Sequence, residues 1–420
     1  MVLMKIMDAG DLNLSRREPV DSEAQRVAQA VVDEVRAGGE EALRRCAERF
    51  GEVRQGDKLF YSREELARSL DCVERADREL IARVADRIRR FAAAQRESLK
   101  PFEFPIPGGT AGQMIAPVAR AGCYAPGGRF PLPSSVLMTA VTARAAGVAE
   151  VWVASPKPTA MVLAAAAASG ADGLLAAGGA QAIAAMAYGA GPMPACDVIA
   201  GPGNRYVTAA KKIVSGTVAI DMLAGPSELV VLADSSADPA VVAADLIAQA
   251  EHDPDAIPVL VTTDRSLAED VLRRMDRQLE RLPTAKTARG ALANGFVLVA
   301  SDMKGAIEAC DRIAPEHIEL QVKDAERLAE KLSNYGALFI GAAAAEVLGD
   351  YGAGPNHTLP TGGTSRHTGG LSVLNFLRVR TWMRIDDAAA ARGMIEDAAR
   401  LGEIEGLAAH AISANLRISR

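Results

Sequence analysis

Short apolar runs alternate with helical segments through the middle of the chain. The runs have the length of buried strands and form two successive series, at 148–155, 173–177 and 197–200, then at 229–233, 258–263, 296–300 and 337–340. Ala-rich helical segments such as 135–146 separate them. This alternation predicts an α/β fold with two Rossmann-like parallel sheets, and it places ligands at the carboxyl ends of the strands. One large continuous sheet is the alternative.

Both flanks of this region are predicted to be helical. Residues 20–50 and 63–100 combine helical periodicity with dense charge, which indicates a helical N-terminal layer. From Leu371 onward the chain is again helical, short and amphipathic. A tail of this size has little core of its own, so it needs another surface to cover.

One predicted helix carries a pair of metal-ligand side chains. Asp238 is the expected N-cap and Pro239 the first helical residue, and Pro254 lies just beyond the end. Gln249 and His252 are therefore three residues apart near the helix C-terminus and lie on one face. A carbonyl oxygen and an imidazole nitrogen at that spacing could share a divalent metal. The alternative is a polar helix end that faces water.

Histidine is scarce in this chain, and all five histidines have polar sequence around them: His252, His317, His357, His367 and His410. Histidine next to a carboxylate is the combination that both general-base catalysis and metal ligation use. Each single histidine, taken alone, is more often a structural hydrogen-bonding group.

Asp350 opens the Gly-rich loop Y-G-A-G-P-N-H-T-L-P-T-G-G, where backbone can approach a ligand closely. The loop is equally consistent with a plain surface turn. For a set of only nitrogen and oxygen ligands, such as Gln249, His252, Asp350 and His410, zinc or a neighbouring transition metal fits better than calcium. The absence of a thiolate ligand in this set favours a catalytic metal over a structural one.

Composition excludes several classes of protein. A net charge of −6 and a pI near 5.6 show no excess of basic residues, so nucleic acid is not an expected partner. No apolar run has membrane-spanning length, and the sequence M-V-L-M-K-I-M-D at the start lacks the apolar core of a signal peptide. The five scattered cysteines indicate reduced thiols. We therefore expect a cytoplasmic protein with no membrane partner.

Neither common nucleotide-binding motif is complete. The segment G-P-G-N-R-Y has Tyr206 where G-x-G-x-x-G needs its third glycine, and no P-loop sequence occurs. Spacing alone therefore does not predict a dinucleotide site.

Six motifs carry a more specific signal. They are G-P-G-N-R-Y-V-T-A-A-K, D-M-L-A-G-P-S-E, A-Q-A-E-H-D, A-P-E-H-I-E-L, D-Y-G-A-G-P-N-H-T-L-P-T-G-G and E-G-L-A-A-H. Together, and in this order, they resemble the histidinol dehydrogenase family from about residue 110 to the C-terminus. The resemblance implies an NAD-dependent, zinc-requiring enzyme that oxidises L-histidinol to L-histidine through the aldehyde. It also implies a homodimer with shared active sites.

Matching these motifs residue by residue gives a set of site residues for each role. The implied zinc ligands are Gln249, His252, Asp350 and His410. The implied substrate contacts are these four residues with Ser227, His317, His357 and Glu405. The implied cofactor contacts are Tyr124, Gln181 and Asn204. The implied catalytic pair is Glu316 and His317, in which His317 takes the alcohol proton and Glu316 helps activate the water that hydrates the aldehyde.

The resemblance also implies a division into domains. We expect an N-terminal arm over 1–18, a first α/β domain from 19–120 and 229–370, a second over 121–228, and a helical tail over 371–420 that crosses to the partner subunit.

Two segments depart from the family's usual pattern. Arg129 follows a Gly-Gly pair where small or apolar residues are common, and residues 365–382, which include His367, lack the usual aromatic-Asp-Phe and Lys-Arg-Thr sequences. Because guanidinium pairs well with sulfonate or carboxylate, one alternative is a paralogue that oxidises another polar alcohol, such as a sulfonated propanediol. A second alternative is a catalytically dead, metal-binding dimer.

Overall fold

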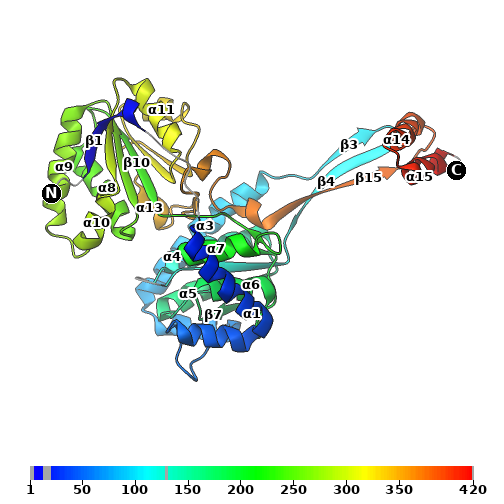
Figure 1. Ribbon diagram of the computed structural model, residues 1–420, viewed down its shortest axis with the longest axis horizontal. Helices are drawn as coiled ribbons and strands as arrows, with labels where there is room; N and C mark the ends of the chain where they lie inside the picture. The colour runs from blue at the N-terminus through cyan, green and yellow to red at the C-terminus, as the bar shows by residue number, and fades with distance from the viewer. Residues whose placement is uncertain (1–3, 13–19, 128–130, 419–420) are drawn as a thin grey trace.

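The computed structural model describes residues 4–12, 20–127 and 131–418. Two α/β units lie against each other, and a long arm projects away from them and carries the C-terminus at its far end (Figure 1). No helix within the described ranges is both long and apolar enough to span a membrane.

The first unit is built on a six-stranded parallel sheet with the strand order β1-β12-β11-β10-β13-β14. The strands are β1 (Lys5–Asp8), β10 (Glu228–Ala233), β11 (Ile257–Thr262), β12 (Phe296–Val299), β13 (His317–Gln321) and β14 (Ala337–Ile340). One face is covered by α8 (Pro239–His252), α9 (Arg265–Leu279) and α10 (Ala285–Leu292). The other is covered by η1 (Ala9–Asp11), α11 (Met303–Ile313) and α12 (Ala325–Ala329), and α13 (Glu346–Asp350) follows β14.

The second unit has a mixed six-stranded sheet with the order β2-β7-β6-β5-β8-β9, in which only β2 runs antiparallel to its neighbour. The strands are β2 (Phe60–Ser62), β5 (Arg120–Tyr124), β6 (Glu150–Ala154), β7 (Gly173–Leu175), β8 (Val198–Ala200) and β9 (Ala219–Ile220). One core contains α2 (Arg63–Ser69), η2 (Leu70–Cys72), α3 (Arg75–Glu97), α4 (Pro133–Ala146) and α5 (Ala160–Ala168). The second core of this unit contains α1 (Ser22–Arg49), α6 (Gly179–Tyr188) and α7 (Arg205–Val214).

The arm is a three-stranded antiparallel ribbon tipped by two helices (Figure 1). Its elements are β3 (Phe102–Ile106), β4 (Gly109–Pro117), β15 (Leu377–Ile385), α14 (Arg392–Ile404) and α15 (Ala408–Ile418), and η3 (Thr364–Arg366) and η4 (Val373–Phe376) precede β15. Leu371, Val373 and Phe376 are buried in the second unit and anchor the base of the arm.

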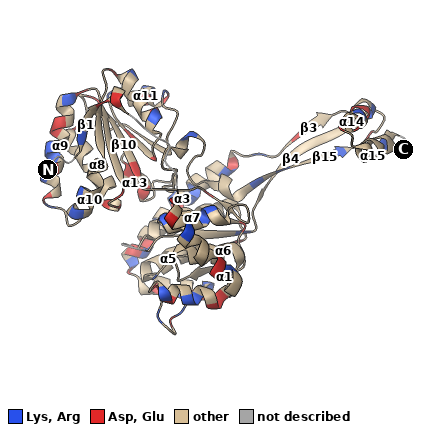
Figure 2. Cartoon of the chain, in the orientation of Figure 1, with Lys and Arg blue, Asp and Glu red and all other residues tan. Residues whose placement is uncertain are grey.

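One parallel sheet and a second that is parallel except for its edge strand β2 confirm the predicted fold class, and the expected strands are present with shifts of a residue or two at their ends. Helix α8 begins as predicted, because the Asp238 side chain accepts a hydrogen bond from the backbone N–H of Ala240 at 2.8 Å and Pro239 needs no N–H partner. Charged helices are spread over both units (Figure 2).

The expected domain division was wrong for the N-terminal layer. Residues 19–120 pack mainly with the second unit and not with 229–370, because α1 buries its apolar face against α6 and α7, and α3 packs on α4. They contact the first unit through α3, where the Arg87 side chain donates to the carbonyl oxygen of Gly352 at 2.5 Å. The short strand β2 also joins the second sheet, beside β7. These helices therefore find their apolar partners in the unit that follows them in sequence.

Two other boundaries also differ from expectation. Lys5–Asp8, expected in a separate arm over 1–18, forms an edge strand of the first sheet and pairs with β12. The tail over 371–420 is not purely helical, because β15 pairs with β4 along all nine of its residues before the two helices begin. Backbone pairing with a strand far away in sequence left no signal in the local pattern.

A buried ion pair holds the second unit near its last strand. The Lys211 ammonium donates to the carbonyl oxygen of Gly201 at 3.0 Å and to the Asp221 carboxylate. The other Asp221 oxygen accepts the Gly201 N–H at 2.8 Å. The ion pair therefore binds both the carbonyl oxygen and the N–H of Gly201, at the start of the G-P-G-N segment.

We predict that Asp221→Ala lowers the free energy of unfolding by about 3–5 kcal/mol, because it leaves the Lys211 ammonium buried without a counter-charge. The double variant Lys211→Met/Asp221→Ala should lose less, since it removes both charges. Urea unfolding at one protein concentration measures both losses. An equal loss in the two variants would contradict this account.

Candidate active site

The predicted polar residues of the first unit gather where that unit faces the second. Ser227, Glu316 and His317 lie at the amino ends of β10 and β13, and His252 ends helix α8 just before β11. His357, in the Gly-rich loop, reaches the second unit, where its Nε2 lies 3.4 Å from the hydroxyl of Ser135 at the start of α4.

This position corrects one expectation. In the first unit the residues lie at the amino edge of the sheet, whereas ligands were expected at the carboxyl edge. The second unit follows the expectation, because Tyr124 ends β5 and Asn204 follows β8. The amino edge of one sheet therefore faces the carboxyl edge of the other across the candidate site.

Three groups in this cluster are spaced to hold a metal ion. Ligand atoms of His252, Glu346 and Asp350 all lie within 4.8 Å of one another, and His252 Nε2 is 3.4 Å from Asp350 Oδ2. Gln249 lies one turn before His252 and is fully buried. The structure thus brings together three of the four predicted metal ligands, Gln249, His252 and Asp350.

Glu346 was missed at the sequence level. It lies four residues before Asp350, one turn away on α13, and a carboxylate at that spacing was the available signal. The Gln249 amide is best placed with its nitrogen toward Glu346, where it donates to Oε1 at 2.7 Å and to Oε2 at 3.1 Å. The opposite orientation would set a carbonyl oxygen against the carboxylate.

His317 is held as a neutral base. Its Nδ1 lies 3.2 Å from the carbonyl oxygen of Glu228, which can only accept, so Nδ1 carries the proton and the Nε2 lone pair stays available. Burial lowers the pKa of His317 to about 4. The ring is therefore almost entirely uncharged near pH 7.

Glu316 is fixed beside His317. Its Oε2 accepts the backbone N–H of Glu228 at 3.0 Å and lies 3.7 Å from His317 Nδ1, and the Ser227 side chain also hydrogen-bonds to it. Burial raises the pKa of Glu316 well above its usual range, and the nearby carboxylates of Glu228 and Asp350 add to the rise. His357 Nδ1 donates to the carbonyl oxygen of Asp350 at 2.9 Å, and burial lowers the pKa of His357.

The cluster lacks a positive partner of its own. Among the described residues, the ion pairs of Glu316, Glu346 and Asp350 involve only imidazoles, with no lysine or arginine. Burial raises the pKa of Glu346 well above its usual range, with Asp350 and Glu316 as further causes. A bound cation would offset this excess of buried negative charge, and imidazole, amide and carboxylate ligands suit zinc.

The predicted cofactor residues form a second group. The Tyr124 hydroxyl accepts the N–H of Gly179 at 3.1 Å, and the Gln181 amide donates to Glu52 at 2.9 Å. Asn204 caps α7 by accepting the N–H groups of residues 206 and 207. Desolvation raises the pKa of Glu52, although hydrogen bonds from the Gly178 N–H and the Gln181 amide act in the opposite direction.

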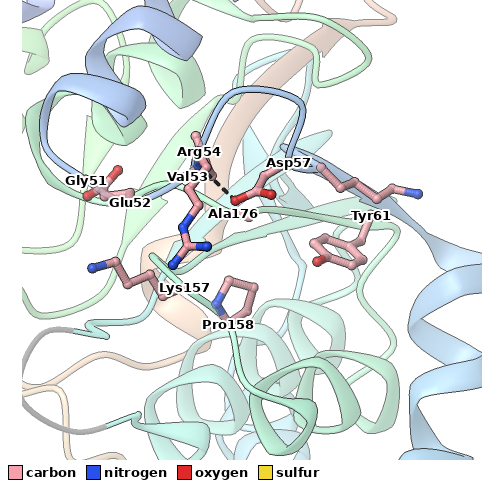
Figure 3. A pocket seen from close by; sticks show the side chains of 10 residues that line it. Gly51, Glu52, Val53, Arg54, Asp57, Tyr61, Lys157, Pro158 and Ala176 are labelled. Carbon is pink, nitrogen blue, oxygen red and sulfur yellow. Dashed lines mark hydrogen bonds between the residues drawn. The ribbon is translucent and has the colours of Figure 1, made fainter.

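A cavity of about 590 Å³ adjoins this group, and Glu52 lines it. Arg54 extends across the cavity toward Lys157 and Pro158, and Tyr61 lies on the other side (Figure 3). Lysine and arginine side chains beside an aromatic ring suit a phosphate-bearing ligand. Sequence reasoning did not find Glu52, because it lies in the loop after α1, far from the recognised motifs.

The remaining predicted residues do not join the cluster. Glu405 and His410 are exposed on the helices at the tip of the arm, far from α8 and α13 in the same chain (Figure 1). His367 is exposed beside η3. Arg129 lies outside the described residues.

Comparisons with known proteins agree with one another. The family model for histidinol dehydrogenase matches residues 14–418. The chain is 44% identical to histidinol dehydrogenase from Thermus thermophilus over 94% of this chain and 95% of that protein. It is also 44% identical to histidinol dehydrogenase from Nitratidesulfovibrio vulgaris, over 98% and 96% of the two chains.

A solved structure extends this similarity to three dimensions. The crystal structure of histidinol dehydrogenase from Elizabethkingia anophelis superimposes with a TM-score of 0.91 at 30% identity, covering 100% of this chain and 99% of that one. On these findings the chain belongs to the histidinol dehydrogenase family and is an oxidoreductase.

Proposed function

We propose that this chain is an NAD-dependent, zinc-requiring histidinol dehydrogenase that oxidises L-histidinol to L-histidine in two steps and acts in histidine biosynthesis in the cytoplasm. The observation that carries the proposal is the cluster of His252, Glu346 and Asp350, which Gln249 joins through Glu346, beside the buried pair Glu316 and His317. A base beside a potential metal site, facing a second unit with a separate cavity, is an arrangement that suits cofactor-dependent oxidation.

The metal would be held by Gln249, His252 and Asp350, with His410 of the partner subunit as the fourth ligand. When bound, zinc supplies a fixed positive charge that orients the substrate. Ser227 and His357 of the same chain, together with Glu405 of the partner subunit, complete the proposed substrate contacts. Ser227 and His357 line the same junction between the units, which supports their assignment.

NAD⁺ would bind the second unit through Tyr124, Gln181 and Asn204, and when bound it supplies the hydride acceptor. Glu52 connects Gln181 to the cavity shown in Figure 3. Arg54 and Lys157 in this cavity are positively charged and could pair with the pyrophosphate of the cofactor.

His317 acts as the base in both oxidations. Its free Nε2 takes the proton of the alcohol while the carbinol carbon loses hydride, which gives the aldehyde. Glu316 then takes a proton from the water that adds to the aldehyde carbon. As the water adds, the protonated His317 returns its proton to the carbonyl oxygen, which gives the hydrate and leaves His317 neutral again. The hydrate then loses a hydroxyl proton to His317 and a second hydride, which leaves the carboxylic acid. A buried carboxyl with a raised pKa suits the middle step, because it is a stronger base than an exposed one.

The arm supports a dimer in which the sites are shared. Its tip helices expose large apolar side chains, with Ile404 at 64%, Ile412 at 60% and Leu416 at 62% exposure. Apolar surface of this kind normally marks an interface. A second copy could cover the tip and receive Glu405 and His410, which lie far from the cluster of their own chain.

We predict that product analysis yields about two NADH per histidine formed from L-histidinol, as a four-electron oxidation requires. NADH absorbance and chromatographic quantification of histidine measure the ratio. Supplying L-histidinal in parallel should give about one NADH per histidine. One NADH from histidinol with released aldehyde would contradict the two-step proposal, and oxidation of a sulfonated propanediol in place of histidinol would favour the paralogue.

We predict that His317→Ala lowers oxidation of the alcohol by orders of magnitude while zinc stays bound, because the proton acceptor is lost and the proposed ligands are intact. Glu316→Gln should mainly slow conversion of supplied L-histidinal to the acid. Single-turnover rates for each half-reaction, with zinc content as the control, separate these effects. Equal losses on both half-reactions in both variants would remove the proposed division of roles.

We predict that co-refolding equal amounts of Asp350→Ala and His410→Ala restores roughly a quarter of wild-type sites. Random pairing gives about half heterodimers, each with one site that carries both lesions and one that carries neither. Activity per subunit, with mass spectrometry to confirm heterodimers, measures this. If His410 acted within its own chain, the mixture would stay at the background of the separate variants.

A further inference from the structure

Glu346 touches the metal-site cluster without belonging to the set of ligands proposed above. It lies on α13 one turn before Asp350, it is 5% exposed, and both of its carboxyl oxygens lie within hydrogen-bond distance of the Gln249 amide nitrogen. It also lies 3.7 Å from His317 Nδ1. The role of this buried carboxyl group is therefore open.

Unlike a carboxylate ligand, the Gln249 amide can bind a metal in only one of its two orientations. Its amide end has one oxygen that can bind a metal and one nitrogen that cannot, and the two differ little in size. The amide is fully buried, so water does not select its orientation. Some neighbouring group has to determine which atom points toward His252 and Asp350.

Glu346 is placed to make that selection. A carboxylate accepts hydrogen bonds, so it pairs with the amide nitrogen, at 2.7 Å and 3.1 Å, and turns the amide oxygen the other way. Glu346 is itself held, because its backbone N–H donates to Glu319 Oε1 at 2.6 Å. The same short helix thus carries Asp350 and the carboxylate that would orient Gln249.

We propose that Glu346 is the positioning residue of the metal site, and that its carboxylate holds the Gln249 amide with the oxygen toward the metal. This inference rests on the proposed function, since it assumes that Gln249 is a ligand. Partners of this kind outside the ligand set fix ligand orientation, and their loss typically lowers metal affinity 10–100-fold.

The test exchanges the two side chains. Glu346→Gln should weaken zinc binding by about tenfold or more, because an amide at position 346 can pair with either end of the Gln249 amide and no longer selects one. The exchange Glu346→Gln/Gln249→Glu should restore affinity to within a few-fold of wild type. In this double variant either oxygen of the carboxylate at position 249 can bind the metal, so its orientation need not be selected. The amide at position 346 donates to that carboxylate, and the net charge is unchanged.

Glu319→Gln is the matched control. It alters a buried carboxyl group that has no contact with the Gln249 side chain, and the amide oxygen at position 319 can still accept the Glu346 N–H, so its zinc affinity should stay within about twofold of wild type. Chelator competition on the full-length dimer gives the affinities, and thermal unfolding of the metal-free proteins confirms that all variants are folded. With cobalt in place of zinc, the absorption bands should change in Glu346→Gln and stay unchanged in Glu319→Gln.

The outcomes separate this inference from the function on which it rests. If the wild-type protein bound no zinc, the proposed function would fail first. If wild type bound zinc and Glu346→Gln bound it equally well with the same cobalt spectrum, only the positioning role would be overturned. A weakened Glu346→Gln variant that the exchange did not rescue would also overturn it, because a site that needs only an oriented oxygen at position 249 would accept the carboxylate there.

Discussion

The architecture around the candidate site depends on a concentration of buried carboxyl groups that no lysine or arginine among the described residues neutralises. Glu316, Glu346 and Asp350 converge from the start of β13 and from α13 and are paired only with imidazoles. Such an arrangement is costly by itself, because each buried negative charge raises the cost of the next. It becomes favourable when a cation occupies the centre, so the protein's own charges already favour a metal.

The two units make complementary contributions at this junction. The first unit presents helix and strand ends that carry acids and imidazoles, and the second presents the carboxyl ends of its strands, which is the edge where α/β sheets usually bind nucleotides. Hydrogen bonds cross the junction, for example from the Asn356 amide in the Gly-rich loop to the carbonyl oxygen of Met138 on α4 at 2.8 Å. Two reactants could therefore approach from opposite sheets.

Much of the fold followed from local pattern, and the exceptions have physical causes. Strands such as β10 and β11 are uniformly apolar and buried, so they were visible in the sequence. Strand β13 was missed because it reads H-I-E-L-Q, yet all five residues are buried, with Glu319 and Gln321 facing polar neighbours instead of water. The pairing of β15 with β4 was missed because it joins residues at least 260 positions apart, whereas β3 and β4 form a local hairpin. The ligands on α8 and α13 were identified from motifs, whereas Glu346 lies outside those motifs, and its spacing of one helical turn from Asp350 was a weaker signal.

The edge strand β1 has a consequence for how the chain assembles. Lys5–Asp8 pairs with Phe296–Val299, and the whole second unit and the first strands of the arm lie between them in sequence. During synthesis the second unit can form its core before the partner of β1 exists, since domains generally fold as units as the chain emerges. The first residues made are therefore among the last to be placed in a sheet, and closure of so long a loop adds to the time that folding of the first unit takes.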